Sequence, residues 1–450
     1  MVYRMYAPVA VKDYQQTAAL LHFYKKIYAI IGAVIFGLGL CVIPFMDYII
    51  KDKPDVSGLT LYYILFLINT TLSYWFASYK ASVLYADQKE YIKTNVQNAT
   101  SILQSALQIV LLIIFRKYLL YLLVQLGCNI ILNLYVAHLV DKRYPQIREY
   151  RDARLTSDER GQIKKDAEAL VLSRFGHVVL NGTDNIIISA VAGVLWVGRL
   201  SNYTLICDSV TSVLCQITAA ITGSLGNFFA TEDKRAGYAL FKKIEFLNFW
   251  LYGFSFIALV TLLDPFVQIW AGGRFVLGLP ISIAIAINFF VAGYMNTLWV
   301  FRSTLGLFKQ GKYCPIIVAL VNIVLSIILG KIWGVFGVLF ATFLSRASIN
   351  MWYDPIILHK YGFEVSCKPF FIRYLKRILL LSIVLVVMLF VRNAVMPTGV
   401  TFWRFVLMMV ITALVPNVVF WAAYHRSDEY DYFKSILKDR VIAPIRGKLH

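Results

Sequence analysis

Long apolar segments recur along the whole of this 450-residue chain. A helix needs about 20 mainly apolar residues to cross the hydrocarbon core of a bilayer. Hydrophobic residues make up 59% of the chain, charged residues make up 15%, and the mean hydropathy is +0.67, which is far from the composition of soluble domains. The sequence therefore predicts an all-α polytopic membrane protein. Its twelve expected spans are residues 27–50, 59–79, 94–115, 118–140, 169–192, 203–225, 246–270, 277–301, 314–333, 336–357, 378–396 and 402–424.

The basic residues lie almost entirely between these spans. The net charge is +19, but a nucleic-acid partner would need a basic soluble domain, and the cations here sit in short gaps between apolar runs, so we expect no nucleic-acid partner. Of the 44 Lys and Arg residues, 33 lie in the terminal segments and the even-numbered loops, and nine lie in the opposite loops. The positive-inside rule then predicts that both termini are cytoplasmic.

The longest connector divides the chain. It covers residues 141–168 and carries eight basic and seven acidic side chains, which is typical of a solvated linker. We expect an N-terminal lobe of four spans before it and a C-terminal lobe of six spans after it. The tail is expected either to be solvated or to lie on the membrane as an amphipathic helix. The predicted regions are an N-terminal lobe (1–140), a cytoplasmic linker (141–168), a C-terminal lobe (169–357), two additional spans (358–424) and a cytoplasmic tail (425–450).

The fifth predicted span carries ionisable side chains. An ionised group at mid-membrane costs about 2.5 to 3.5 kcal/mol on insertion scales, so such groups face a bundle interior or an aqueous cavity. Arg174 and Asp184 are about 15 Å apart along one helix and cannot pair directly. Two interpretations stay open, pairing between helices and the lining of a polar cavity. At 100° per residue one face of this span collects Arg174, His177, Asn181, Asp184 and Asn185.

Three other spans have polar stripes at helical spacing. We expect the four stripes to surround a central hydrophilic pathway. Arg346 and Arg174 are the two cations inside predicted spans, and Arg346 can be partly neutralised by Asp354, two turns further on. The stripes are Gln97, Ser101, Gln104 and Gln108 in the third span, Asp208, Ser212 and Gln216 in the sixth, and Arg346, Asn350 and Asp354 in the tenth.

Enzyme motifs are absent from the sequence. It contains no GxxxxGK[ST], HExxH or GxSxG motif and no CxxC pair, so we expect no enzyme, no cofactor and no metal site. A multidrug or other small-molecule antiporter would need an acidic cation site in the N-terminal lobe. The four predicted spans of this lobe contain a single acidic residue, Asp47. A glycan polymerase or acyltransferase would need a large outer loop or a catalytic histidine and acid. A transporter is therefore the favoured class.

Several segments together resemble one family, the Wzx-type polysaccharide flippases, which transport lipid-linked oligosaccharides and belong to the MATE/MOP exporter superfamily. Each segment alone is weakly specific, whereas their order along the chain is specific. The segments are YKKIYAIIGAVIFGLGLCVIPF (24–45), LYADQKEYI (84–92), LNGTDNIIIS (180–189), VGRLSNYTLI (197–206), ITGSLGNFFATED (221–233), FLNFWLYGF (246–254), LGLFKQGKYCPI (305–316) and WGVFGVLFATFLS (333–345).

The resemblance implies a two-lobed bundle in the bacterial cytoplasmic membrane that works by alternating access. Its substrate would be undecaprenyl-pyrophosphate-linked oligosaccharide for surface polysaccharide such as O-antigen, capsule or exopolysaccharide. It also implies membrane lipid, a polymerase and other polysaccharide-assembly proteins as partners, and leaves any coupling cation unspecified. Arg174 would contact phosphate and His177 would add charge when protonated. Sugar hydroxyls would bind Asn181, Asp184 and Asn185.

The chain departs from this family at its start. Members usually have fourteen spans, and the first 26 residues here resemble the cytoplasmic loop after the second span. About sixty residues, comprising two helices, are thus expected to be missing, which leaves an incomplete N-terminal lobe.

Overall fold

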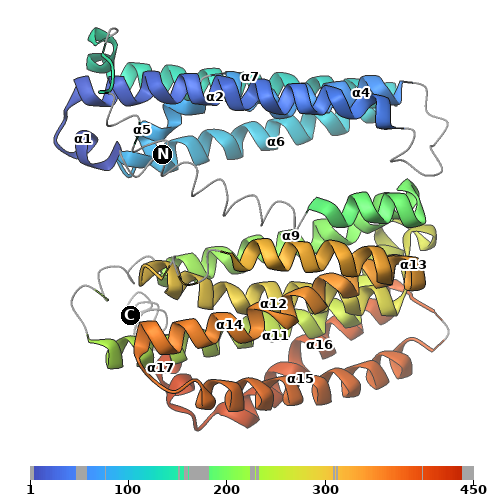
Figure 1. The fold of residues 1–450 in the computed structure, drawn as a ribbon. Coiled ribbons are helices and arrows are strands. Elements are labelled where there is room, and N and C mark those ends of the chain that lie inside the picture. The colour runs from blue at the N-terminus through green and yellow to red at the C-terminus, as the bar shows by residue number, and fades with distance from the viewer. Residues whose placement is uncertain are drawn as a thin grey trace, which may run out of the picture. The chain divides into compact units, whose positions relative to one another are not determined.

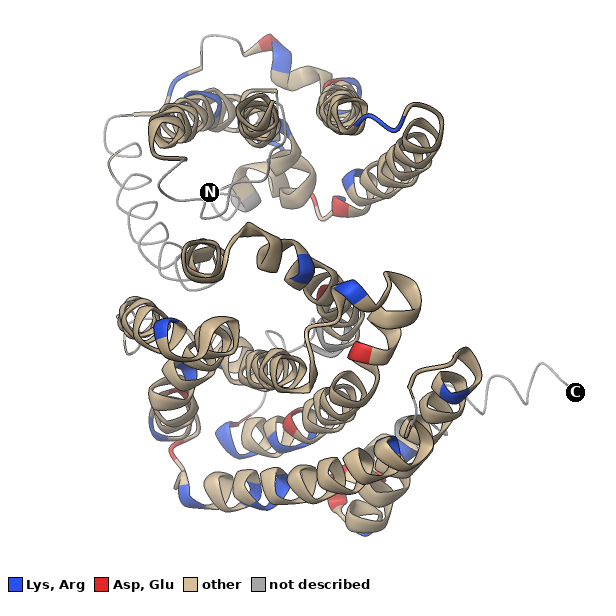
Figure 2. Ribbon diagram, turned by 90° about the vertical axis from the view of Figure 1, so that its right-hand side faces the viewer, with Lys and Arg blue, Asp and Glu red and all other residues tan. Residues whose placement is uncertain are grey.

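The computed structural model describes residues 5–46, 58–76, 78–150, 153–156, 182–222, 233–307, 313–397 and 399–437, with residues 161, 229 and 310. All the regular secondary structure in this part of the chain is helical (Figure 1), which confirms the all-α prediction. Most of the ribbon in Figure 2 is tan because charged residues are few. The chain forms two compact units. Unit 1 comprises Met1–Ile49 and Lys53–Leu172, and unit 2 comprises Ile50–Asp52 and Ser173–His450.

Unit 1 is a bundle of long helices. In Figure 1, α2 packs on α4, α4 packs on α7, and α6 packs on α7. Its hydrophobic core gathers at one end of the bundle, around Leu20, Tyr24, Leu84 and Val140. Its described elements are α1 (Tyr6–Ala10), α2 (Tyr14–Val42), η2 (Ile43–Phe45), α4 (Leu59–Trp75), η3 (Ser78–Lys80), α5 (Ala81–Ala86), α6 (Glu90–Phe115), α7 (Tyr118–Arg143) and η4 (Pro145–Glu149).

Unit 2 is built around its two most buried long helices, α11 and α12. Helix α11 contacts α9, α12, α15 and α16, and α12 also contacts α9 and α13. Residues 182–192 form a further helix. The other described elements are α9 (Val194–Thr222), α11 (Lys234–Trp270), η5 (Gly273–Phe275), α12 (Leu279–Thr304), α13 (Cys314–Ser348), α14 (Asn350–Ile357), the π-helix η7 (Leu358–Phe363), α15 (Lys368–Val395), α16 (Phe402–Tyr424) and α17 (Asp428–Leu437).

Eight helices in the described ranges are long and apolar enough to cross a membrane. One of them contains α13, which doubles back at Gly334. Gly334 has φ 62° and ψ −139°, a conformation that glycine adopts without steric cost. A Cβ on Gly337 would lie 2.0 Å from the Leu329 carbonyl oxygen, so the two arms approach closely. The arms correspond to the predicted ninth and tenth spans.

Several helices extend beyond the predicted spans. Helix α2 begins at Tyr14 instead of residue 27, α11 begins at Lys234 instead of residue 246, and α15 begins at Lys368 instead of residue 378. Asp13 caps α2 by accepting a hydrogen bond from the Gln16 N–H at 2.9 Å. Hydropathy detects only the apolar part of a helix, which explains the late predicted starts.

The predicted fifth and sixth spans are only partly covered. Residues 169–181 of the fifth lie outside the described residues. The helix of residues 182–192 ends at Gly193, which has φ 96°. Helix α9 starts at the next residue, Val194, so the predicted start of the sixth span at residue 203 was wrong. Gly193 adopts the positive φ that separates the two helices, and apolar content alone does not predict this boundary.

The described part of the tail contains α17, which packs on α11 of the same unit. Helix α17 contacts α11, with the Lys243 Nζ 3.9 Å from the centroid of the Tyr432 ring. The rings of Tyr430 and Trp250 stack with centroids 6.1 Å apart. These contacts attach α17 to α11, and whether the tail is solvated or lies on the membrane stays a prediction.

A polar cluster joins the loop before α6 to the end of α7 in unit 1. Asp87 accepts hydrogen bonds from the Lys89 ammonium and the Tyr144 hydroxyl, and the Lys80 ammonium donates to Asp141 at 2.6 Å. Burial by itself raises the pKa of Asp87, but the hydrogen bonds from Lys89 and Tyr144 outweigh it and hold this pKa below its ordinary value of 3.8.

This cluster should make unit 1 sensitive to acid. Because the pKa of Asp87 is depressed on folding, its contribution is complete above the ordinary carboxyl pKa and is lost as the pH falls through the folded-state pKa. Asp87→Asn should lower the free energy of unfolding by at most about 1 kcal/mol at neutral pH, since the group is partly exposed. Thermal unfolding in detergent should show the difference from the parent closing below about pH 4. A difference that is independent of pH would contradict this assignment.

A buried ion pair connects three helices of unit 2. Glu245 on α11 accepts from the Arg377 guanidinium on α15 and from the Tyr294 hydroxyl on α12, and the two charged residues are 1% and 4% exposed. The Arg377 guanidinium also lies over the Phe249 ring, 5.0 Å from its centroid. The sequence interpretation had put Arg377 in a loop, which was wrong because α15 starts ten residues earlier than its apolar core.

Removing one member of this ion pair should lower the free energy of unfolding more than removing both members. Arg377→Ala leaves a buried carboxylate without its cation and should lower the free energy of unfolding by about 3 to 5 kcal/mol. The double variant Glu245→Leu/Arg377→Met removes both charges and should lose less than either single variant. Thermal or denaturant unfolding of the full chain in detergent measures all three. Additive losses would show that the two side chains are not coupled.

Candidate functional site

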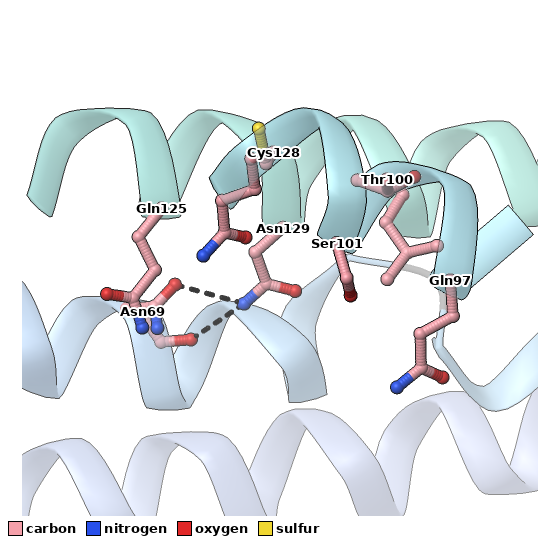
Figure 3. A pocket seen from close by; sticks show the side chains of 9 residues that line it. Asn69, Gln97, Thr100, Ser101, Gln125, Cys128 and Asn129 are labelled. Carbon is pink, nitrogen blue, oxygen red and sulfur yellow. Dashed lines mark hydrogen bonds between the residues drawn. The ribbon is translucent and has the colours of Figure 1, made fainter. Parts of the chain in front are cut away.

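Three residues of the polar stripe on α6 line a pocket inside unit 1. Gln97, Ser101 and Gln104 face a cavity of about 210 Å³ between α4, α6 and α7 (Figure 3). Gln108, the fourth member of the stripe, is buried and donates its amide to the Tyr121 carbonyl at 3.1 Å, so it joins α6 to α7 outside the pocket. The remaining lining residues are Asn69, Thr100, Gln125, Cys128, Asn129 and Leu132.

Part of this lining is fixed by hydrogen bonds. The Asn129 amide nitrogen donates to the backbone and side-chain oxygens of Asn69, both at 3.1 Å. The Asn133 amide nitrogen in turn donates to the side-chain oxygen of Asn129 at 2.9 Å. Asn69 and Asn129 are therefore held in one orientation between α4 and α7.

Unit 2 holds a second polar group, around Asp184. Its Oδ2 accepts from the Thr342 hydroxyl at 2.7 Å, and the Thr342 oxygen accepts from the Asn322 amide at 2.9 Å. Arg346 is close enough to interact electrostatically with Asp184 and donates to the Asn288 carbonyl at 3.4 Å. The Asp184 network thus joins the helix of residues 182–192 to α12 and both arms of α13.

The Asp184 network has spare hydrogen-bonding capacity. Oδ1 of Asp184, Oδ1 of Asn322 and the hydroxyl of Ser326 are buried and have no hydrogen-bond partner in the described part of the chain. Buried polar atoms are nearly always paired with protein or water, so these atoms mark a place where a polar ligand or water can be accommodated. Within the described ranges, no three His, Cys, Asp or Glu side chains cluster as a metal site would require.

The other predicted site residues lie apart from this network. Asn185, Asp208 and Gln216 are exposed on their helices, and Asn350 is half-buried with its Oδ1 unpaired. No hydrogen bond or ion pair among the described residues connects these four to Asp184. Three further candidates, Arg174, His177 and Asn181, lie outside the described residues.

The expected neutralisation of Arg346 by Asp354 was wrong. Helix α13 ends at Ser348, and Ile349 leaves helical geometry with φ −123° and ψ −65°. Asp354 on α14 is therefore rotated away from the Arg346 stripe and forms an ion pair with Arg302 of α12. Helical periodicity predicts a shared face only while the helix continues.

Sequence reasoning also missed a polar network at the other end of α11. Asp264 accepts from the Tyr203 hydroxyl at 2.6 Å and from the Ser282 hydroxyl at 2.8 Å. The Arg392 guanidinium lies 4.0 Å from the same carboxylate. An acid within an apolar run was the signal that could have found this network. Asn322, Ser326 and Thr342 gave no such signal, because small polar residues are common in membrane helices.

Comparison with known proteins identifies the architecture. No protein-family model and no curated protein matches the sequence. A solved structure does match, described as "Lipid II flippase MurJ, inward closed conformation", with 17% identity and a TM-score of 0.62 over 94% of this chain and 88% of that one. The chain has the fold of this flippase. This match shows the fold alone, so membership of the MATE/MOP superfamily and the narrower resemblance to Wzx-type flippases both stay predictions.

Thr342 is the hydroxyl on which the Asp184 network depends. Thr342→Val keeps the side-chain shape but leaves the Asp184 carboxylate and the Asn322 amide without their shared partner, which should lower the free energy of unfolding by about 1 to 3 kcal/mol. Thr342→Ser restores the hydroxyl and should recover most of that loss. Thermal unfolding in detergent compares the two. Equal losses for both variants would show that methyl packing is the stabilising contribution.

Proposed function

We propose that this protein is a transporter that flips undecaprenyl-pyrophosphate-linked oligosaccharide across the bacterial cytoplasmic membrane for surface polysaccharide synthesis. The observation that carries the proposal is the match of nearly the whole chain to the fold of a lipid II flippase. The family-like segments in the sequence support the choice of a polysaccharide precursor over other lipid-linked cargo.

Buried polar chemistry in unit 2 supports a hydrophilic path. Asp184, Asn322, Thr342 and Arg346 belong to helices that fall on predicted spans. Oδ1 of Asp184 and Oδ1 of Asn322 have no hydrogen-bond partner among the described residues. Such groups are expensive inside a membrane and commonly mark substrate or ion pathways. In the proposed mechanism Arg346, together with Arg174, contacts the pyrophosphate while the polyprenyl chain stays in lipid.

The proposed location is the bacterial cytoplasmic membrane, with both termini on the cytoplasmic side. Alternating access would then carry the head group from the cytoplasmic to the outer leaflet. A polymerase and other polysaccharide-assembly proteins would take up the product there.

Arg346→Ala should slow transport. The full chain is reconstituted in liposomes containing a labelled undecaprenyl-pyrophosphate-linked disaccharide, and exposure of the sugar to an enclosed glycosidase is followed. Losing a charge-assisted contact of about 1.5 to 3 kcal/mol corresponds to a decrease of about 10- to 100-fold in rate. Arg346→Lys keeps the charge but lacks the planar guanidinium group, so its transport rate should lie between those of Arg346→Ala and the parent.

Arg274→Ala is the matched control, because Arg274 is an exposed cation beyond the end of α11. It should transport at the parent rate. Full activity of Arg346→Ala at equal protein level would remove Arg346 from the proposed mechanism. A parent protein that transports no lipid-linked saccharide would overturn the proposed function itself.

A further inference from the structure

The described residues that line the pocket of unit 1 all have uncharged side chains. Amides, hydroxyls, one thiol and one leucine surround it. Figure 3 shows side chains from α4, α6 and α7 around the same space. A pyrophosphate placed there would meet no cation among the lining residues, although anions gain most from charge-assisted contacts. The chemistry of the lining therefore favours an uncharged polar occupant.

The glutamines of the pocket have hydrogen-bonding groups to spare. Gln97, Gln104 and Gln125 make no side-chain hydrogen bond to any residue in the described ranges, whereas Gln108, one turn further along α6, finds the Tyr121 carbonyl. The Gln108 amide is thus hydrogen-bonded where α6 contacts α7. The glutamine amides beside the pocket have no such partner among the described residues. Free amides at membrane depth need a polar partner, because lipid offers none.

The size of the pocket limits its occupant. A volume of about 210 Å³ corresponds to about seven waters at roughly 30 Å³ each and is below the about 300 to 1,000 Å³ of sites for drug-sized ligands. One sugar ring is of this size, whereas a complete lipid-linked head group is larger. Each glutamine amide offers both donors and an acceptor, which matches ring hydroxyls and an acetamido group.

We propose that the pocket formed by α4, α6 and α7 is a subsite for one neutral sugar ring of the transported saccharide. This inference rests on the proposed function and adds the part of the substrate that unit 1 recognises. Gln97, Gln104 and Gln125 bind hydroxyl or acetamido groups. Asn69 and Asn129, already bonded to each other, form a rigid wall, and Leu132 contacts the apolar face of the ring.

Protection of an introduced cysteine tests the subsite. Ser101→Cys places an exposed thiol in the pocket, and alkylation by a small maleimide is followed peptide by peptide, because the chain has six native cysteines. Free N-acetylglucosamine at about ten times a Kd in the millimolar range should slow alkylation about tenfold. Inorganic pyrophosphate at the same concentration should leave the rate unchanged.

Asn98→Cys is the matched control. Asn98 is exposed on the same helix, next to Gln97, and does not line the pocket, so its alkylation should be insensitive to sugar. In the Ser101→Cys background, Gln97→Leu/Gln104→Leu should abolish protection, and Asn98→Leu should retain it.

Three results would overturn the subsite: no protection by N-acetylglucosamine, glucose or galactose, equal protection by pyrophosphate, or equal protection of Asn98→Cys. The liposome assay separates this proposal from the transport function. Transport without protection rejects the subsite alone. Protection with no transport of any lipid-linked saccharide supports the subsite as a sugar site and rejects the proposed function.

Discussion

A bilayer core provides no hydrogen-bond partners, so every polar group placed in it must be matched by the chain or by something bound to it. This constraint shapes both units. Backbone groups are satisfied within long helices, which is why the described secondary structure is helical. Polar side chains are not hydrogen-bonded by helix formation itself. Those that are paired with other side chains hold helices together, and those that lack a partner mark candidate binding sites.

Unit 2 matches most of its buried charges internally. Glu245 and Asp264, near opposite ends of α11, lie close to Arg377 and Arg392 of α15. The two acids and the two arginines follow the same order along their helices, so α11 and α15 run in the same direction. Three antiparallel passages of the chain separate α11 from α15: α12, the first arm of α13, and the second arm of α13 with α14. An odd number of passages returns α15 to the direction of α11. These pairs hold helices together, and the Asp184 network, with its unpaired atoms, is the part of unit 2 that resembles a binding site.

Apolar length in the sequence was enough to predict the helices, and the last predicted span agrees with α16 at both ends. It failed where backbone conformation sets the helix ends, as at Gly193 and Gly334, and where a helix extends beyond its most apolar part, as α11 does at Glu245. Periodicity placed Gln97, Ser101 and Gln104 on one face of a helix, and in the structure these three line one pocket. It could not find Asn322 or Thr342, because their role depends on which helices meet Asp184, and a single helix carries no information about its neighbours.

The polar groups of the two units differ in a way that bears on a composite substrate. A pyrophosphate-linked saccharide joins a strongly charged group to neutral rings, and one type of side chain cannot serve both. The Asp184 network of unit 2 contains charged groups together with amides and a hydroxyl, whereas the described residues that line the pocket of unit 1 carry no charge. An anion gains most from a guanidinium fork, and a sugar ring gains most from groups that both donate and accept. For the proposed transporter, an uncharged amide pocket would suit discrimination among sugars, because a site built to hydrogen-bond a hydroxyl rejects a ring that lacks it.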